Sequence, residues 1–74
     1  MKPDWKDAPK WAKWLAQDRC YNAWHWFEYK PSISISGYDI WSPSIWGGRD
    51  IGYGYGITDK HWKDTLERRP KEVT

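Results

Sequence analysis

Residues 47–57, GGRDIGYGYGI, have the closest glycine spacing in the chain and raise the question of a phosphate-binding loop. A dinucleotide-binding fingerprint needs G-x-G-x-x-G between a strand and a helix, and a P-loop needs Gly-Lys followed by Ser or Thr. The stretch contains G-x-G-x-G instead, and no lysine directly follows its glycines. A flexible linker would not carry Ile and Tyr at alternate positions. The period of two therefore predicts a strand.

This strand would have one face with side chains and one bare face. The side-chain face would hold Ile51, Tyr53, Tyr55 and Ile57, and the bare face would hold Gly52, Gly54 and Gly56. Glycine inside a strand weakens it or marks the close approach of another group. Either the protein's own indole rings would pack on the bare face, or a ligand or a partner's side chain would bind there.

Few residues are spaced for acid–base or metal chemistry. The available acid–base sets are His25 with Glu28, and His61 with Asp59 and Asp64. No nucleophile motif such as G-x-S-x-G accompanies them. Cys20 is the only cysteine, and with two histidines it cannot complete a zinc-binding set or an internal disulfide. We therefore expect that the protein is not an enzyme, that it has no catalytic residues, and that it binds neither a metal nor a cofactor.

Aromatic residues are the best candidates for binding. The chain has eight Trp, five Tyr and one Phe, but only two Leu and one Met, so most Trp side chains must help to build the core. Rings left exposed in the charge-poor middle of the chain would instead bind a partner, because Trp and Tyr bring large rigid area and a polar tip. The candidate binding residues are Trp41, Trp46, Arg49, Tyr53 and Tyr55. The alternative is that these rings all belong to the core.

Three segments before the glycine-rich stretch also predict strands. Residues 11–18, WAKWLAQD, fit either a strand or a short helix, and the strand is favoured. Residues 23–31 form an aromatic run without glycine that Pro31 would end. Residues 32–37 alternate Ile with Ser, as a half-exposed strand does.

Residues 58–70 predict a short helix. Trp62 and Leu66 are four residues apart, Thr58 or Asp59 can cap the first turn, and Pro70 would end the helix. The expected fold class is mainly β, a small antiparallel sheet of three to five strands with a short C-terminal helix. An α+β arrangement is the alternative.

The length of 74 residues limits the chain to one small domain. We expect this domain at residues 11–70, between an extended lead-in at 1–10 and a frayed tail at 71–74. Trp5 in the lead-in is expected to fold back onto the domain. The chain has no run of about 18 apolar residues, and its first residues lack the apolar region and cleavage site typical of a signal peptide. We therefore expect a cytoplasmic protein that does not bind membranes.

Several segments carry a resemblance to a known group. DWKDAPKWAKWLAQD, WHWFEYKP and WKDTLERRP, around a Trp-containing middle, resemble short Trp-rich uncharacterised accessory proteins of tailed bacteriophages. In that group the first hairpin turn reads D-x-x-G-x-W, whereas this chain has DRCYNAW, with Asn22 in place of the glycine. Asn tolerates the left-handed conformation, so the turn can be kept. The resemblance also favours the strand at 11–18.

The resemblance implies a role in host takeover or in countering host defence. The expected function is a non-enzymatic accessory protein that binds a host protein through an aromatic patch in the host cytoplasm. The alternative is a protein that stacks its rings on a nucleotide, a single-stranded nucleic acid or another small ligand. The net charge of +2 is low for phosphate binding, which favours the protein partner. An edge strand that begins near residues 32–36 could also pair with a second copy and form a homo-oligomer.

Overall fold

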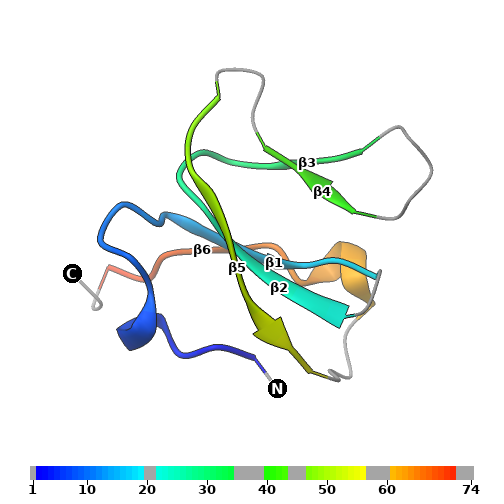
Figure 1. The fold of residues 1–74 in the computed structure, drawn as a ribbon, viewed down its shortest axis with the longest axis horizontal. Coiled ribbons are helices and arrows are strands. Elements are labelled where there is room, and N and C mark those ends of the chain that lie inside the picture. The colour runs from blue at the N-terminus through cyan, green and yellow to red at the C-terminus, as the bar shows by residue number, and fades with distance from the viewer. Residues whose placement is uncertain (1, 20–21, 35–39, 44–46, 57–60, 72–74) are drawn as a thin grey trace.

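The computed structural model describes residues 2–19, 22–34, 40–43, 47–56 and 61–71 (Figure 1). Its elements in chain order are η1 (Trp5–Asp7), β1 (Trp14–Gln17), β2 (Ala23–Phe27), β3 (Ser32–Ile33), β4 (Trp41–Ser42), β5 (Asp50–Tyr55), η3 (Trp62–Asp64) and β6 (Glu67–Arg68). The helices in these ranges are short, and none has the length and hydrophobicity needed to cross a membrane. The chain is mainly β, as predicted.

Four strands form one antiparallel sheet in the order β5-β2-β1-β6, and β3 pairs with β4 in a separate two-stranded sheet. This arrangement confirms the predicted antiparallel sheet. It also confirms the strand over the helix for 11–18, because β1 lies within that segment. β3 covers only the start of the strand predicted at 32–37, of which residues 35–37 lie outside the described part of the chain.

Both faces of the four-stranded sheet are apolar, because β2 carries aromatic side chains on each of them. The first core cluster, on the face of Trp24 and Trp26, is made of Trp5, Ala12, Leu15, Trp24 and Trp26. The second core cluster, on the face of Phe27, is made of Ala16, Phe27, Trp41 and Trp62. Figure 1 shows the covers: η1 lies against one side of the sheet, and the two-stranded sheet lies on the other.

The N-terminal segment is held against the first core cluster by Trp5. The Asp4 carboxylate accepts a hydrogen bond from the Lys6 N–H at 2.9 Å and caps η1. The Trp5 ring is 5% exposed, and its centroid lies 4.8 Å from that of Trp26. Its indole N–H donates to Glu67 Oε1 at 2.6 Å, which links the N-terminus to β6. The expectation that Trp5 folds back is confirmed.

Gln17 ties the end of β1 to the following turn and to the end of β5. Its side-chain amide donates to the Asn22 carbonyl at 2.9 Å and to the Gly56 carbonyl, and the residue is 2% exposed. Asn22 has a φ of 52°, which confirms the left-handed turn expected there. One buried amide thus supplies donors to two carbonyls from different parts of the chain.

The helix predicted over 58–70 is wrong. η3 makes a single 3-10 turn, and the chain then extends into β6, which pairs with β1. The buried Thr65 hydroxyl fixes this path: its oxygen accepts from the Gln17 N–H at 2.9 Å and lies 2.7 Å from the Trp62 carbonyl, to which it donates. Trp62 and Leu66 both reach the second core cluster, but pairing with β1 overrides the helical spacing.

Two glycines lead into β5. Gly47 and Gly48 have φ values of 84° and 96°, a region that glycine adopts most readily. A Cβ at Gly48 would overlap the ring of Tyr29, so a larger residue is excluded by space as well as by conformation. The Glu28 N–H then donates to the Arg49 carbonyl at 2.9 Å, which starts the pairing of β5 with β2.

The role of Gln17 generates a test of the fold. Gln17→Glu keeps the shape but replaces two donor contacts with an acceptor that faces two carbonyls. We expect it to lower the free energy of unfolding by at least about 3 kcal/mol at neutral pH, since buried unsatisfied groups cost about 1–3 kcal/mol each and charged ones more. The loss should shrink at acidic pH, where the introduced carboxyl can donate. Urea denaturation measures both effects. Ser32→Glu, which adds the same charge at an exposed position, should change stability little.

Candidate functional site

The structure brings together only part of the predicted binding set. Tyr53 and Tyr55 lie on the edge strand β5 and are 48% and 76% exposed. Arg49 precedes β5, is exposed, and places its guanidinium carbon 5.8 Å from the ring centroid of Trp11. Trp46 lies outside the described residues. Ile51, between Arg49 and the tyrosines in sequence, is also exposed, so β5 carries three exposed apolar side chains.

Trp41 belongs to the core instead. It is 8% exposed, and its ring packs edge-on against that of Trp62, with 6.0 Å between centroids. Its indole N–H donates to the Gln17 carbonyl at 3.1 Å, and its backbone N–H donates to Asp18 Oδ1 at 2.8 Å. For this residue the core alternative holds, so we leave Trp41 out of the candidate surface.

A β-bulge interrupts the alternation predicted for the glycine-rich strand. The register of β5 against β2 shifts midway, which leaves Tyr53 as the extra residue. Tyr53 packs edge-on against Trp26, with 5.8 Å between ring centroids. Tyr55 pairs with Ala23, so it lies on the opposite face, that of His25. The prediction that the tyrosines of this strand share one face is therefore wrong.

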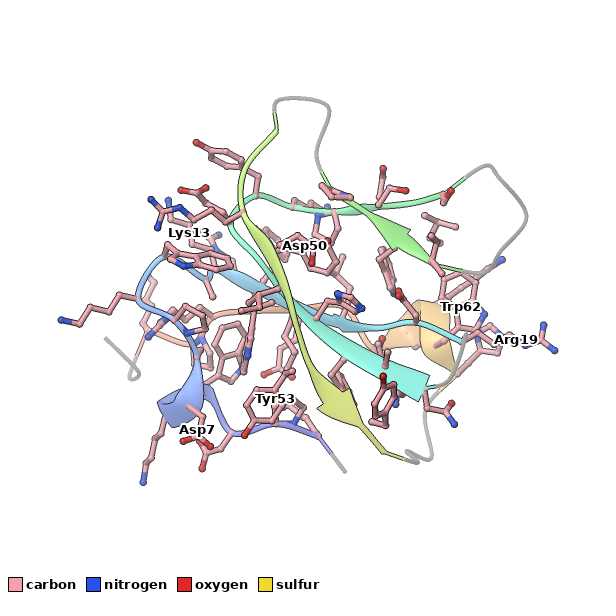
Figure 2. All side chains as sticks on the ribbon, in the orientation of Figure 1. Asp7, Lys13, Arg19, Asp50, Tyr53 and Trp62 are labelled. Atoms are coloured by element: carbon pink, nitrogen blue, oxygen red, sulfur yellow. The ribbon has the colours of Figure 1, made fainter. Side chains whose placement is uncertain are left out.

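Tyr53 also shows that the surroundings of β5 are acidic. Its hydroxyl donates to Asp7 Oδ2 at 3.2 Å, and Figure 2 shows the two side chains beside one another. The charge of Asp7, followed by partial burial, this hydrogen bond and the charge of Asp4, raises the pKa of Tyr53 above its ordinary value of 10.0. Negative potential therefore reaches the exposed face of Tyr53.

The glycines of β5 are not required by the fold. The backbone of Gly52 and Gly54 does not lie in the left-handed region. A Cβ at Gly54 would have no neighbour within 4 Å, and one at Gly52 would contact the His25 ring at 3.5 Å, an ordinary van der Waals distance. The expectation that indole rings of the protein occupy the bare face is wrong at both positions. The bulge also divides the predicted bare face, because Gly52 pairs with His25 and Gly54 pairs with Trp24, which lie on opposite faces of the sheet. A concavity of about 300 Å³ lies along this stretch, lined by Gly52–Tyr55 of β5 and Ala23–His25 of β2.

His25 lies between two carboxylates at the border of this concavity. Its Nδ1 is 3.1 Å from Asp50 Oδ1, and its Nε2 is 3.4 Å from Asp18 Oδ2. Burial raises the pKa of the Asp18 carboxyl above 3.8, although the Trp41 N–H and the charge of His25 oppose this shift and the charge of Asp50 adds to it. Both ring nitrogens of His25 are therefore engaged by carboxylates.

Sequence reasoning missed this cluster and considered different pairs. Glu28, proposed beside His25, instead accepts a hydrogen bond from the Arg49 N–H at 3.0 Å. His61 Nδ1 accepts from the Lys63 N–H at 3.2 Å, and Asp59 lies outside the described residues. No local spacing could have identified the cluster, because its three members come from three separate parts of the chain and meet only through the strand register.

Among the residues that the structure places, no three His, Cys, Asp or Glu side chains are arranged to hold a metal ion. No family model, curated protein or solved structure matches the chain. The candidate surface is therefore interpreted from its own geometry. We call the exposed side chains of Ile51, Tyr53 and Tyr55 the edge surface.

The position of Asp7 predicts the titration of Tyr53. Asp7→Asn removes the largest contribution to the raised pKa, so the pKa of Tyr53 should fall towards 10.0. The ring resonances of Tyr53, followed by NMR in an alkaline titration, measure this pKa directly. Asp64→Asn removes an exposed carboxylate elsewhere and should leave it unchanged. An identical pKa in the wild type and in Asp7→Asn would contradict an acidic environment created by Asp7.

The raised pKa of Asp18 predicts a pH dependence of stability. Because the folded-state pKa exceeds the unfolded value of 3.8, the folded protein binds more protons between the two values. Asp18 therefore contributes stability at low pH that is lost as the pH rises through its folded pKa. The free energy of unfolding of the wild type, minus that of Asp18→Asn, should increase from about pH 7 to about pH 4. Urea denaturation at several pH values measures the difference, and a constant or decreasing value would contradict the assignment.

Proposed function

We propose that the protein is a non-enzymatic binding protein that docks on another protein through the edge surface. One observation carries this proposal: three of the five large hydrophobic side chains exposed in the described residues lie on a single edge strand. Such a concentration of apolar area is typical of an interaction site, whereas single exposed apolar residues are ordinary.

The side chains of the edge surface suit protein recognition. Tyrosine combines a large rigid ring with a polar tip and is enriched among the residues that dominate binding energy. The bulge directs the rings of Tyr53 and Tyr55 to opposite sides of β5. A partner that reaches this edge can contact both rings and the unpaired backbone between them.

The charges near the edge surface favour a protein partner over a nucleic acid. Asp7 contacts Tyr53, and Asp50 begins β5, whereas the neighbouring Arg49 places its guanidinium over the Trp11 ring. Phosphate groups would therefore be repelled beside Tyr53. A concavity of about 410 Å³ that is bordered by basic side chains, those of Lys10, Lys13 and Arg69, lies by β6 at the opposite edge of the sheet. A single-stranded nucleic acid binds best where rings and positive charge alternate along one groove.

The Asp18–His25–Asp50 cluster supports a binding role over catalysis. His25 has its nitrogens directed at two carboxylates, and the side chains that line the nearby concavity in the described part of the chain include no Ser, Cys or Lys nucleophile. The resemblance to phage accessory proteins supports a host protein as the partner, and the host cytoplasm as the place where they meet.

Affinity capture from a bacterial lysate tests this function. The wild type should retain one stoichiometric protein, and Tyr53→Ala combined with Tyr55→Ala should weaken its binding by at least about tenfold, because truncation of an aromatic hot spot costs about 2 kcal/mol or more. Ile33→Ala removes an exposed apolar side chain from the other sheet and should leave capture unchanged. Equal capture by the double variant would overturn the proposal.

Titration with nucleotides and short oligonucleotides tests the alternative function, in which the exposed rings stack on a nucleotide or a single-stranded nucleic acid. Ring stacking on a base would change the tryptophan fluorescence, because Tyr53 contacts the Trp26 ring. We expect unchanged emission. A saturable change that disappears in the Tyr53→Ala, Tyr55→Ala variant would assign the edge surface to nucleotide binding instead.

A further inference from the structure

We infer that the free edge of β5 takes an extended, basic segment of the partner, with an arginine or lysine side chain seated in the concavity beside Gly52. This inference rests on the proposed function and specifies the chemistry of the partner. It is carried by the backbone of the edge strand, the bare backbone of Gly52 on the face of His25, and the carboxylates around His25.

Among the described residues, β5 pairs with β2 alone, so the backbone groups on its outer side are available to a partner. Arg49 accepts from the Glu28 N–H at 2.9 Å, and the Gly56 N–H donates to the Asn22 carbonyl at 3.3 Å, so these two residues face β2. Alternation from Arg49 turns the polar groups of Asp50 and Gly52 away from β2. An extended peptide can add to such an edge through main-chain hydrogen bonds.

The other edge of the same sheet is protected. β6 has two residues, and Pro70 follows shortly after it, which limits pairing. β5 has six residues and carries two glycines, so an incoming chain meets little steric obstruction. Strand addition is therefore favoured at β5.

Strand pairing would direct one side chain of the partner into the concavity. Gly52 pairs with His25, so both lie on the same face of the sheet. A partner residue opposite Gly52 would share that face, since directly opposite residues of antiparallel strands do so. Its side chain would pass over the bare backbone of Gly52 towards His25 and the exposed ring of Tyr55.

The chemistry at this position favours a cation. His25 lies between the carboxylates of Asp18 and Asp50, and an imidazole ring can carry at most one positive charge, so it cannot cancel the negative charge of both carboxylates when both are ionised. The Asp50 side chain remains 30% exposed and can meet a guanidinium or ammonium group. The ring of Tyr55 adds a surface over which such a group can lie.

A second copy of the chain fits this edge less well than a basic partner. Pairing β5 with its own copy would bring another Asp50 and another Asp7 to an edge that is already acidic. Like charges placed across a strand pair are destabilising. Charge complementarity therefore selects a basic segment.

Capped peptides of alternating threonine and serine, with one central residue varied, test this inference on the full chain. The arginine peptide should shift the amide NMR resonances of Gly52, Gly54 and Tyr55 in a saturable way at low salt. The same peptide with central glutamate should not. The arginine peptide with N-methylated backbone amides should lose the shifts, because it cannot pair with the edge. This last control leaves the protein unchanged, so its result does not depend on a variant that folds.

Asp50→Asn should weaken the binding of the arginine peptide about two- to fivefold, as expected for the loss of a partly exposed ion pair. Asp64→Asn removes the same charge away from β5 and should have no effect. Equal shifts from the arginine and glutamate peptides, or no shift from either, would overturn the inference. Shifts of the β5 amides with protein concentration alone would also overturn it and would assign the edge to a second copy. None of these outcomes decides the proposed function. That function is tested separately, by the dependence of lysate capture on Tyr53 and Tyr55.

Discussion

The structure depends on one constraint: β2, one of the two inner strands, carries buried aromatic rings on both of its faces. Trp24 and Trp26 point to one side and Phe27 to the other, so both sides of the four-stranded sheet must be covered. Aliphatic residues are scarce, and the covers are further indoles, from Trp5 on one side and from Trp41 and Trp62 on the other. An indole N–H buried without an acceptor costs about 1–3 kcal/mol. The N–H groups of the covering Trp5 and Trp41 have acceptors, whereas those of Trp24 and Trp26 are buried without a partner among the described residues.

The same indoles organise the charges of the surface. Four basic side chains lie over tryptophan rings at 5.7 to 5.8 Å from the centroids: Lys30 over Trp14, Arg49 over Trp11, Lys63 over Trp62 and Arg69 over Trp5. In these contacts the cation is attracted to the ring, and the aliphatic part of the side chain shields the ring from water. Asp7 and Asp50 meanwhile lie at β5. A chain with a net charge of +2 therefore presents acidic groups beside its exposed tyrosines.

Local pattern was sufficient to predict β1, β2, β5 and the start of β3, but it predicted neither β4 nor β6, and it did not predict the register. The aromatic run identified β2, and the alternation of Ile and Tyr with Gly identified β5. The left-handed Asn22 was expected instead from the resemblance, in which a glycine occupies that position of the turn. The bulge at Tyr53, the burial of Trp41 and the contacts of His25 depend on which residues the folded chain places opposite one another. The C-terminal helix failed for the same reason, because its i, i+4 spacing is local, whereas the pairing of β6 with β1 is not.

The glycines of β5 link stability to function. Glycine in a strand is less stable than a β-branched residue, because it loses more entropy on folding and packs no side chain. Glycine is expected in a strand where the backbone needs a left-handed conformation or where a neighbouring group leaves no space for a side chain. Neither condition applies here, since a Cβ at Gly54 would meet open space and one at Gly52 would make an ordinary contact with His25. Folding alone therefore does not account for a bare strand at the edge of the sheet. The docking that we propose would account for it, because a second chain that adds to this edge must approach the backbone between the rings of Tyr53 and Tyr55.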